Sequence, residues 1–184
     1  SGAGKSTLAA CLDRRGYTVV SDDICLLDPR ARNSGVTPGQ TLVVPVAPSL
    51  KLWRSALEHL GARVEDLPQV FSRDDKYRLK ISEIDQRLPL AQVFFLEWAG
   101  HAADTAISIT PVSGVNAVAR MMEFTHNDYL MKATGRREEN FLLCGRILSH
   151  VRAFTLRRPR DFAHIEQVIE QVVDALEPQL NQAG

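Results

Sequence analysis

The chain has 184 residues, of which 45% are hydrophobic, and this length and composition favour a single domain with one sizeable core. It carries 22 basic and 22 acidic residues, so it lacks the net positive charge that attracts nucleic acid or an anionic membrane surface. No apolar run reaches the roughly 18 residues of a membrane span, so neither nucleic acid nor a membrane is an expected partner.

Cys11, Cys25 and Cys144 are widely separated and form no C-x-x-C motif. This spacing favours neither a disulfide framework nor a zinc site. Three isolated thiols instead suit a reducing compartment, and we expect a cytoplasmic protein.

The chain begins on the second half of a P-loop. Residues 1–7 read S-G-A-G-K-S-T, and the full motif G-x-x-x-x-G-K-S/T would place its first glycine about two residues upstream of Ser1. We therefore expect the motif and the buried strand before it to begin upstream of this sequence, with residues 1–184 forming one P-loop catalytic domain. Apolar residues at helical spacing over 6–15, ended by Gly16, predict the helix that follows such a loop.

The loop residues have the chemistry that a nucleoside triphosphate requires. Gly2 and Gly4 let backbone N–H groups face phosphate oxygens, and the helix N-terminus adds favourable electrostatics. Lys5 can reach the β and γ phosphates, and the Ser6 hydroxyl can ligate the Mg²⁺ that bridges them. The motif therefore predicts ATP and Mg²⁺ bound by Ser1, Gly2, Ala3, Gly4, Lys5, Ser6 and Thr7. The alternative is a glycine-containing turn that merely enters a helix.

The first third of the chain continues with short extended segments. Residues 17–20 read as a buried strand that ends in Ser21-Asp22-Asp23, and residues 24–27 continue extended. Proline and glycine mark a loop over 28–40, and residues 41–46 are β-rich. Residues 50–60 are predicted as a helix because their apolar side chains share one helical face before Gly61.

The remaining elements follow from their periodicity and breakers. They are a surface loop over 61–75, a half-exposed strand over 76–81, a central strand over 93–96, a strand over 105–111, helices over 115–124 and 138–150, a strand over 151–156, and a helix capped by Asp161 that runs to Leu176. Together these elements predict an α/β protein with a sheet flanked by helices.

Two adjacent carboxylates stand where an open α/β sheet holds its ligands. Asp22 and Asp23 follow the strand that we predict beside the P-loop helix. One can accept the proton of an attacking hydroxyl while the other holds Mg²⁺ directly or through water. On spacing alone, a turn with an aspartate cap is the alternative.

Residues 1–9 (S-G-A-G-K-S-T-L-A) and 14–23 (R-R-G-Y-T-V-V-S-D-D) resemble the catalytic domain of HPr kinase/phosphorylase and its short HPr kinase-like relatives. Residues 48–53, 76–79, 89–96 and 156–161 are similar to the short branch. The resemblance implies a fold like the HPr kinase C-terminal domain, with a P-loop-containing sheet and flanking helices. It also implies transfer of the γ-phosphoryl group of ATP to a serine, with Asp22 as proton acceptor, Lys5 on phosphate, Ser6 on Mg²⁺, and Asp23 supporting Asp22 or the metal.

The implied acceptor is a serine of a peptide or small protein, since short relatives phosphorylate precursors of ribosomally made peptides, including lasso peptides. The M-E-I-R-G signature of true HPr kinases has no counterpart, and residues 41–48 read T-L-V-V-P-V-A-P. The resemblance therefore does not extend to phosphorolysis or to HPr as the substrate.

HPr kinases assemble as rings, and with arginine-rich segments near 136 and 157 we also expect a homo-oligomer.

Other residues have open interpretations. Glu97 follows four apolar residues, as in a Walker B strand, and a role for it at the metal would favour an ATPase. Arg157, Arg158 and Arg160 can border the nucleotide or remain solvated. Lys51, Lys76, Arg78 and Lys80 can line an acceptor groove or form the wet side of a sheet. Trp53 and Trp98 are expected to pack in the core or a lid rather than stack on a base.

Two other functions remain open on these residues. A P-loop suits a small-molecule kinase equally well, although such an enzyme needs a closed substrate pocket and an arginine-rich lid. A nucleotide-driven ATPase or switch, whose bound state a partner protein recognises, is the third class.

Overall fold

The computed structural model describes residues 4–29, 40–46, 49–82, 84–100, 105–126 and 128–180. It shows a mixed α/β protein, as the sequence predicts. In chain order the elements are α1 (Lys5–Arg14), β1 (Leu26–Asp28), β2 (Leu42–Val44), β3 (Ser49–Trp53), α2 (Arg54–His59), the 3₁₀ helix η1 (Val64–Asp66), β4 (Lys76–Lys80), β5 (Leu88–Pro89), β6 (Gln92–Trp98), β7 (Ser108–Val112), α3 (Gly114–Glu123), α4 (Asp128–Ala133), α5 (Arg137–Leu148), β8 (Arg152–Arg158) and α6 (Ile165–Leu180). None of the described helices has the length and apolar character to cross a bilayer.

The described strands form three small sheets. β8 lies in the middle of one sheet, parallel to β6 and antiparallel to β7. β3 pairs with β4, and β2 lies between β1 and β5, in both cases antiparallel. The expectation of a central strand over 93–96 is therefore wrong for the described sheet, because β6 lies at its edge. The apolar run has another cause: its side chains pack on both faces of the sheet.

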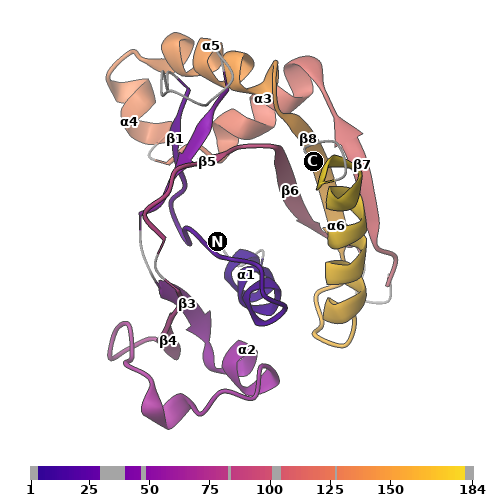
Figure 1. Ribbon diagram of the computed structural model, residues 1–184. Coiled ribbons are helices and arrows are strands. Elements are labelled where there is room, and N and C mark those ends of the chain that lie inside the picture. The colour runs from indigo at the N-terminus through magenta and orange to yellow at the C-terminus, as the bar shows by residue number, and fades with distance from the viewer. Residues whose placement is uncertain are drawn as a thin grey trace.

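The main core surrounds α1, which lies between the β3–β4 pair and the β6–β8–β7 sheet (Figure 1). Residues that contribute fully buried side chains are Ala10 of α1, Leu50 and Leu52 of β3, Leu156 of β8, and Ile165 and Ile169 of α6. Burial of these apolar groups is the main force that holds the four elements together. The N-terminus of α1 is consequently fixed relative to both β3 and β8.

The two faces of the β6–β8–β7 sheet have different neighbours. Leu156 belongs to the core around α1, whereas Ala153 packs with Phe95 and with Ala117 of α3 in a second cluster. Since successive side chains of a strand point to opposite faces, Arg158 lies on the α1 face and Arg157 on the α3 face. This alternation decides which charged residues reach the site described below.

The predicted helix over 50–60 is wrong in its first half. Residues Ser49–Trp53 form β3, whose Leu50 pairs with Leu79 and whose Leu52 pairs with Tyr77 of β4. Leu50 and Leu52 are both buried, which is the period of two that a strand requires. Pairing with a distant strand overrides the helical spacing, and only Arg54–His59 is helical.

Two other expectations are corrected. Residues 17–20 do not form a strand; Val46 N–H bonds to Val20 C=O at 3.4 Å, and no ladder forms there in the described part of the chain. High β-propensity alone does not make a strand without a hydrogen-bonded partner. Asp161 lies four residues before the start of α6, and its carboxylate bonds His164 Nδ1 at 2.7 Å instead of capping the helix at its first turn.

Candidate phosphate-binding and acidic site

Gly4 lies at the point where the chain enters α1. Its φ of 73° is in the left-handed region, which favours glycine. A Cβ at this position would lie 1.9 Å from Arg158 Nη2, so a larger residue would require the Arg158 side chain to move. Ser1, Gly2 and Ala3 lie outside the described residues. The described half of the motif thus has a backbone that requires glycine, followed by Lys5, Ser6 and Thr7 in the first turn of the helix.

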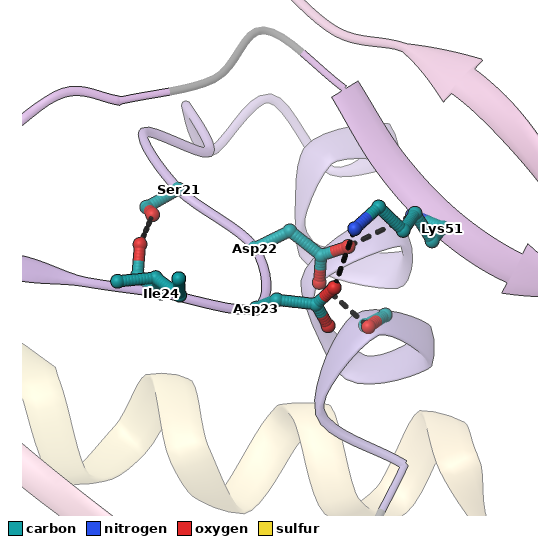
Figure 2. Close-up of polar contacts among 6 residues, drawn as sticks. Ser21, Asp22, Asp23, Ile24 and Lys51 are labelled. Atoms are coloured by element: carbon teal, nitrogen blue, oxygen red, sulfur yellow. Dashed lines mark hydrogen bonds and ion pairs between the residues drawn. The ribbon is translucent and has the colours of Figure 1, made fainter. Parts of the chain in front are cut away.

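The first turn of α1 contacts the acidic pair directly. Ser6 Oγ donates a hydrogen bond of 2.6 Å to Asp22 Oδ1. The backbone N–H of Lys51 donates to Asp22 Oδ2 at 2.8 Å, as Figure 2 shows. Each oxygen of the Asp22 carboxylate therefore accepts a hydrogen bond from a different element, and this fixes its orientation.

Asp23 is joined to the same strand residue by a side-chain contact. Lys51 Nζ lies 2.7 Å from Asp23 Oδ2, and this hydrogen bond lowers the pKa of Asp23 below its ordinary value. Ser21 Oγ donates to the carbonyl oxygen of Ile24, which closes the bend around the two aspartates (Figure 2). The sequence suggests Lys51 only as part of an acceptor groove; the structure instead places it on both carboxylates.

A cavity of about 220 Å³ opens at the N-terminus of α1. Residues 4–7 line it together with the β3–β4 pair, the ends of β6 and β8, and the segment before α6. The charged groups among its described lining residues are Lys5, Lys51, Lys76, Arg158, Arg160, Asp23 and Asp161. Five cations face two carboxylates, so the cavity favours a ligand with several negative charges.

Two tryptophan and cation pairs form walls of this cavity. Trp53 of β3 pairs in register with Lys76 of β4, whose Nζ lies 4.7 Å from the centre of the indole. Trp98 of β6 pairs in register with Arg158 of β8, whose Cζ lies 4.2 Å from the indole centre. The structure thus places both tryptophans in the cavity wall, and Trp53 is 49% exposed rather than part of the core.

Several predicted residues are not brought to the cavity. Glu97 lies on the α3 face of the sheet, where its Oε1 is 2.6 Å from Arg120 Nη2. Arg157 is exposed and shares that face by alternation. Arg78 and Lys80 are exposed on β4 and do not line the cavity. The cavity is lined instead by four cations whose roles the sequence leaves open: Lys51, Lys76, Arg158 and Arg160.

The donor set fits magnesium delivered with a nucleotide. The Ser6 hydroxyl and the two aspartates offer hard oxygen ligands, which Mg²⁺ prefers. Across the described part of the chain, no group of three or more His, Cys, Asp or Glu side chains is arranged to hold a metal ion. Mg²⁺ at phosphate sites usually has one or two protein carboxylates and completes its shell with phosphate oxygens and water, so Ser6, Asp22 and Asp23 are the residues that could hold it.

Comparisons of this chain with protein-family models, with curated proteins and with solved structures gave no match. The functional conclusion therefore rests on the motif and on the geometry of the site. The sequence points to residues 4–7 and to the two aspartates, which the structure brings into contact through Ser6 and Asp22. It does not reveal that Lys51 bonds both aspartates, for which the alternation Leu50-Lys51-Leu52 is the available signal.

Proposed function

We propose that this chain is an ATP-dependent serine kinase that transfers the γ-phosphoryl group of ATP to a serine of a peptide or small protein. The 2.6 Å hydrogen bond between Ser6 and Asp22 carries the proposal. It joins the predicted magnesium ligand of a P-loop helix to the predicted proton acceptor. In this proposal the domain is of the HPr kinase-like P-loop type and works in the cytoplasm.

Asp22 would act as the general base. A serine hydroxyl must lose its proton as it attacks phosphorus, and a carboxylate within hydrogen-bond reach can accept that proton. The Ser6 hydroxyl can rotate about its Cβ–Oγ bond, which would release Asp22 Oδ1 for the substrate. The bond from Lys51 N–H to Oδ2 would keep the carboxylate oriented meanwhile.

The triphosphate would be held by charge and by the helix terminus. Lys5 and the rest of the first turn of α1 line the cavity, and phosphate oxygens are electrostatically favoured at a helix N-terminus. Ser6 and Asp23 would hold Mg²⁺, which when bound neutralises phosphate charge as the bond to the leaving group breaks. Lys51 could then contact either Asp23 or the phosphates, because its ammonium bonds Asp23 and the residue lines the cavity.

The acceptor assay tests this proposal against its alternatives. The chain is incubated with γ-labelled ATP, Mg²⁺ and a panel of serine-containing peptides, each matched by a serine-to-alanine control. Label in the serine peptide and not in its control supports the kinase. Release of free phosphate alone supports the ATPase, and label on a small metabolite supports a small-molecule kinase.

Self-association is part of the same proposal and stays a prediction. Arg136 is exposed, immediately before α5, and pairs with Glu139 of that helix at 2.9 Å, so its charge is partly satisfied within the chain. Light scattering over micromolar concentrations should show a species larger than one chain. A constant monomer mass would contradict a ring-like assembly.

A further inference from the structure

Arg158 is a buried cation at the end of β8. Its relative exposure is 3%, although arginine is seldom buried in proteins. Its place on the α1 face follows from strand alternation, and its register partner on β6 is Trp98. The guanidinium lies over the Trp98 ring, with Cζ 4.2 Å from the ring centre, so the indole holds the guanidinium plane.

The same guanidinium reaches the phosphate loop. Its Nη2 lies so close to Gly4 that a Cβ on that residue would be 1.9 Å away. Lys5 lines the cavity beside it, and the positive end of the α1 dipole points the same way. Burial disfavours the charged form and lowers the pKa of Arg158 from its usual value. Arg158 and Lys5 thus line one cavity, and an anion bound there would be attracted to both.

We propose that Arg158 is a ligand of the β and γ phosphates of the bound nucleoside triphosphate and that Trp98 positions it. This inference rests on the proposed nucleotide site, and it names a residue outside the P-loop and the acidic pair. A guanidinium presents N–H groups in a rigid fork that matches the oxygens of phosphate. Stacking on Trp98 covers a face of that plane, and Nη1 on its edge donates to the carbonyl oxygen of Pro159 at 3.5 Å.

The neighbouring arginines do not share this geometry. Arg157 lies on the opposite face of the sheet and does not line the cavity. Arg160 lines the cavity but is exposed, and its Cζ is 5.7 Å from the Trp98 ring centre. Arg158 alone of the three is both buried and stacked, so we assign the inner phosphate contact to it.

Titration calorimetry of the whole chain with ATP plus Mg²⁺, and separately with inorganic triphosphate, tests the assignment. Arg158→Gln should weaken both ligands by at least about tenfold, because a hydrogen bond to a charged group contributes on that scale. The affinities for the two ligands should fall by similar factors, since both ligands carry the phosphate chain. Arg157→Gln is the matched control and should bind both ligands as the wild type does.

A second variant covers the case in which Arg158→Gln fails to fold. Arg158→Lys keeps the buried charge but not the fork, and should weaken both ligands by about threefold or more. Unchanged affinity in a folded variant overturns the inference while leaving the nucleotide site intact. Weaker ATP binding with unchanged triphosphate binding also overturns it, because the contact would then be with base or ribose. A wild-type chain that binds neither ligand overturns the proposed function as well.

Discussion

Asp22 accepts one hydrogen bond on each carboxylate oxygen, from Ser6 Oγ and from Lys51 N–H. Asparagine can reproduce both contacts, because its oxygen accepts from Lys51 N–H and its NH₂ group donates to Ser6 Oγ. Asp22→Asn should therefore fold normally and bind ATP. Phosphoryl transfer should fall by about 100-fold or more, because an amide cannot accept the serine proton.

Parallel measurement of ATP affinity and of transfer to the serine peptide checks this separation of binding from chemistry. Glu97→Gln is the control, since Glu97 faces α3 and pairs with Arg120. Asp22 would not be the general base if Asp22→Asn transferred phosphate at a near-normal rate. The same conclusion would follow if only Glu97→Gln lost transfer.

Lys51 and Mg²⁺ compete for one carboxylate if Asp23 binds the metal. Lys51→Met removes the ammonium 2.7 Å from Asp23 Oδ2 but keeps the backbone N–H that orients Asp22. The Mg²⁺ concentration for half-maximal transfer should fall by about two- to fivefold, the scale of a partly exposed ion pair. Asp23→Asn should raise that concentration, because a metal ligand or the group that orients one is lost.

A magnesium titration of transfer by the three proteins measures these shifts. Opposite directions for the two variants are the expected result. If Lys51→Met raised the magnesium requirement, its ammonium would have to serve the phosphates rather than compete at Asp23.

At the scale of elements, two glycines frame α1 and offer a matched pair. Gly4 has φ 73° and Gly16 has φ 90°, so alanine at either site is strained by about 1–2 kcal/mol. A Cβ at Gly4 also meets Arg158, whereas one at Gly16 meets nothing within 4 Å. Gly16→Ala should lower only the free energy of unfolding, and Gly4→Ala should in addition weaken ATP binding.

Denaturant unfolding and calorimetry on both variants separate the two effects. Equal ATP affinity in the two variants would show that the close approach of Arg158 to Gly4 has no part in nucleotide binding. Equal and unchanged stability would contradict the left-handed backbone at both sites.

Elements with a clear local period could be predicted from the sequence. Helices α1, α3 and α6 show apolar spacing near 3.6, β4 alternates, and α5 follows the break at residues 135–137, so the predicted positions agree to within a few residues. β3 could not be predicted in this way, because the apolar residues of this region also satisfy a helical period: Leu50, Trp53, Leu57 and Leu60. Only the pairing with β4 decides between helix and strand. The site divides in the same way: Lys5, Ser6, Asp22 and Asp23 lie in local motifs. The pairing of Trp98 with Arg158 depends on a strand register that no local pattern reveals.

For the whole molecule, the arrangement around α1 connects stability to function. Its buried face contacts β3, which holds the acidic pair through Lys51, and α6, which follows the Arg158 segment (Figure 1). α1, β3 and β8 therefore share one core, and β3 bonds the two aspartates through Lys51. A loss of packing there should loosen the site without altering any of its polar groups.

Leu156 is the residue that tests this connection. It is 0% exposed in the middle strand of its sheet and packs in the core around α1, whereas Leu142 on α5 is 61% exposed. Leu156→Ala should lower the free energy of unfolding by about 2–5 kcal/mol through the lost transfer energy and the cavity left behind. Leu142→Ala, which deletes the same atoms, should change it by less than about 0.5 kcal/mol. ATP with Mg²⁺ should raise the melting temperature of Leu142→Ala as much as that of the wild type, because a ligand that binds only the folded state stabilises it by mass action. The rise should be smaller for Leu156→Ala, because the lost packing loosens the site and weakens binding. Denaturant unfolding gives the first comparison and thermal unfolding with and without ligand gives the second. Equal destabilisation by the two substitutions would contradict the shared core, and an equal gain from ligand in the two variants would show that the core stabilises the chain without positioning the site.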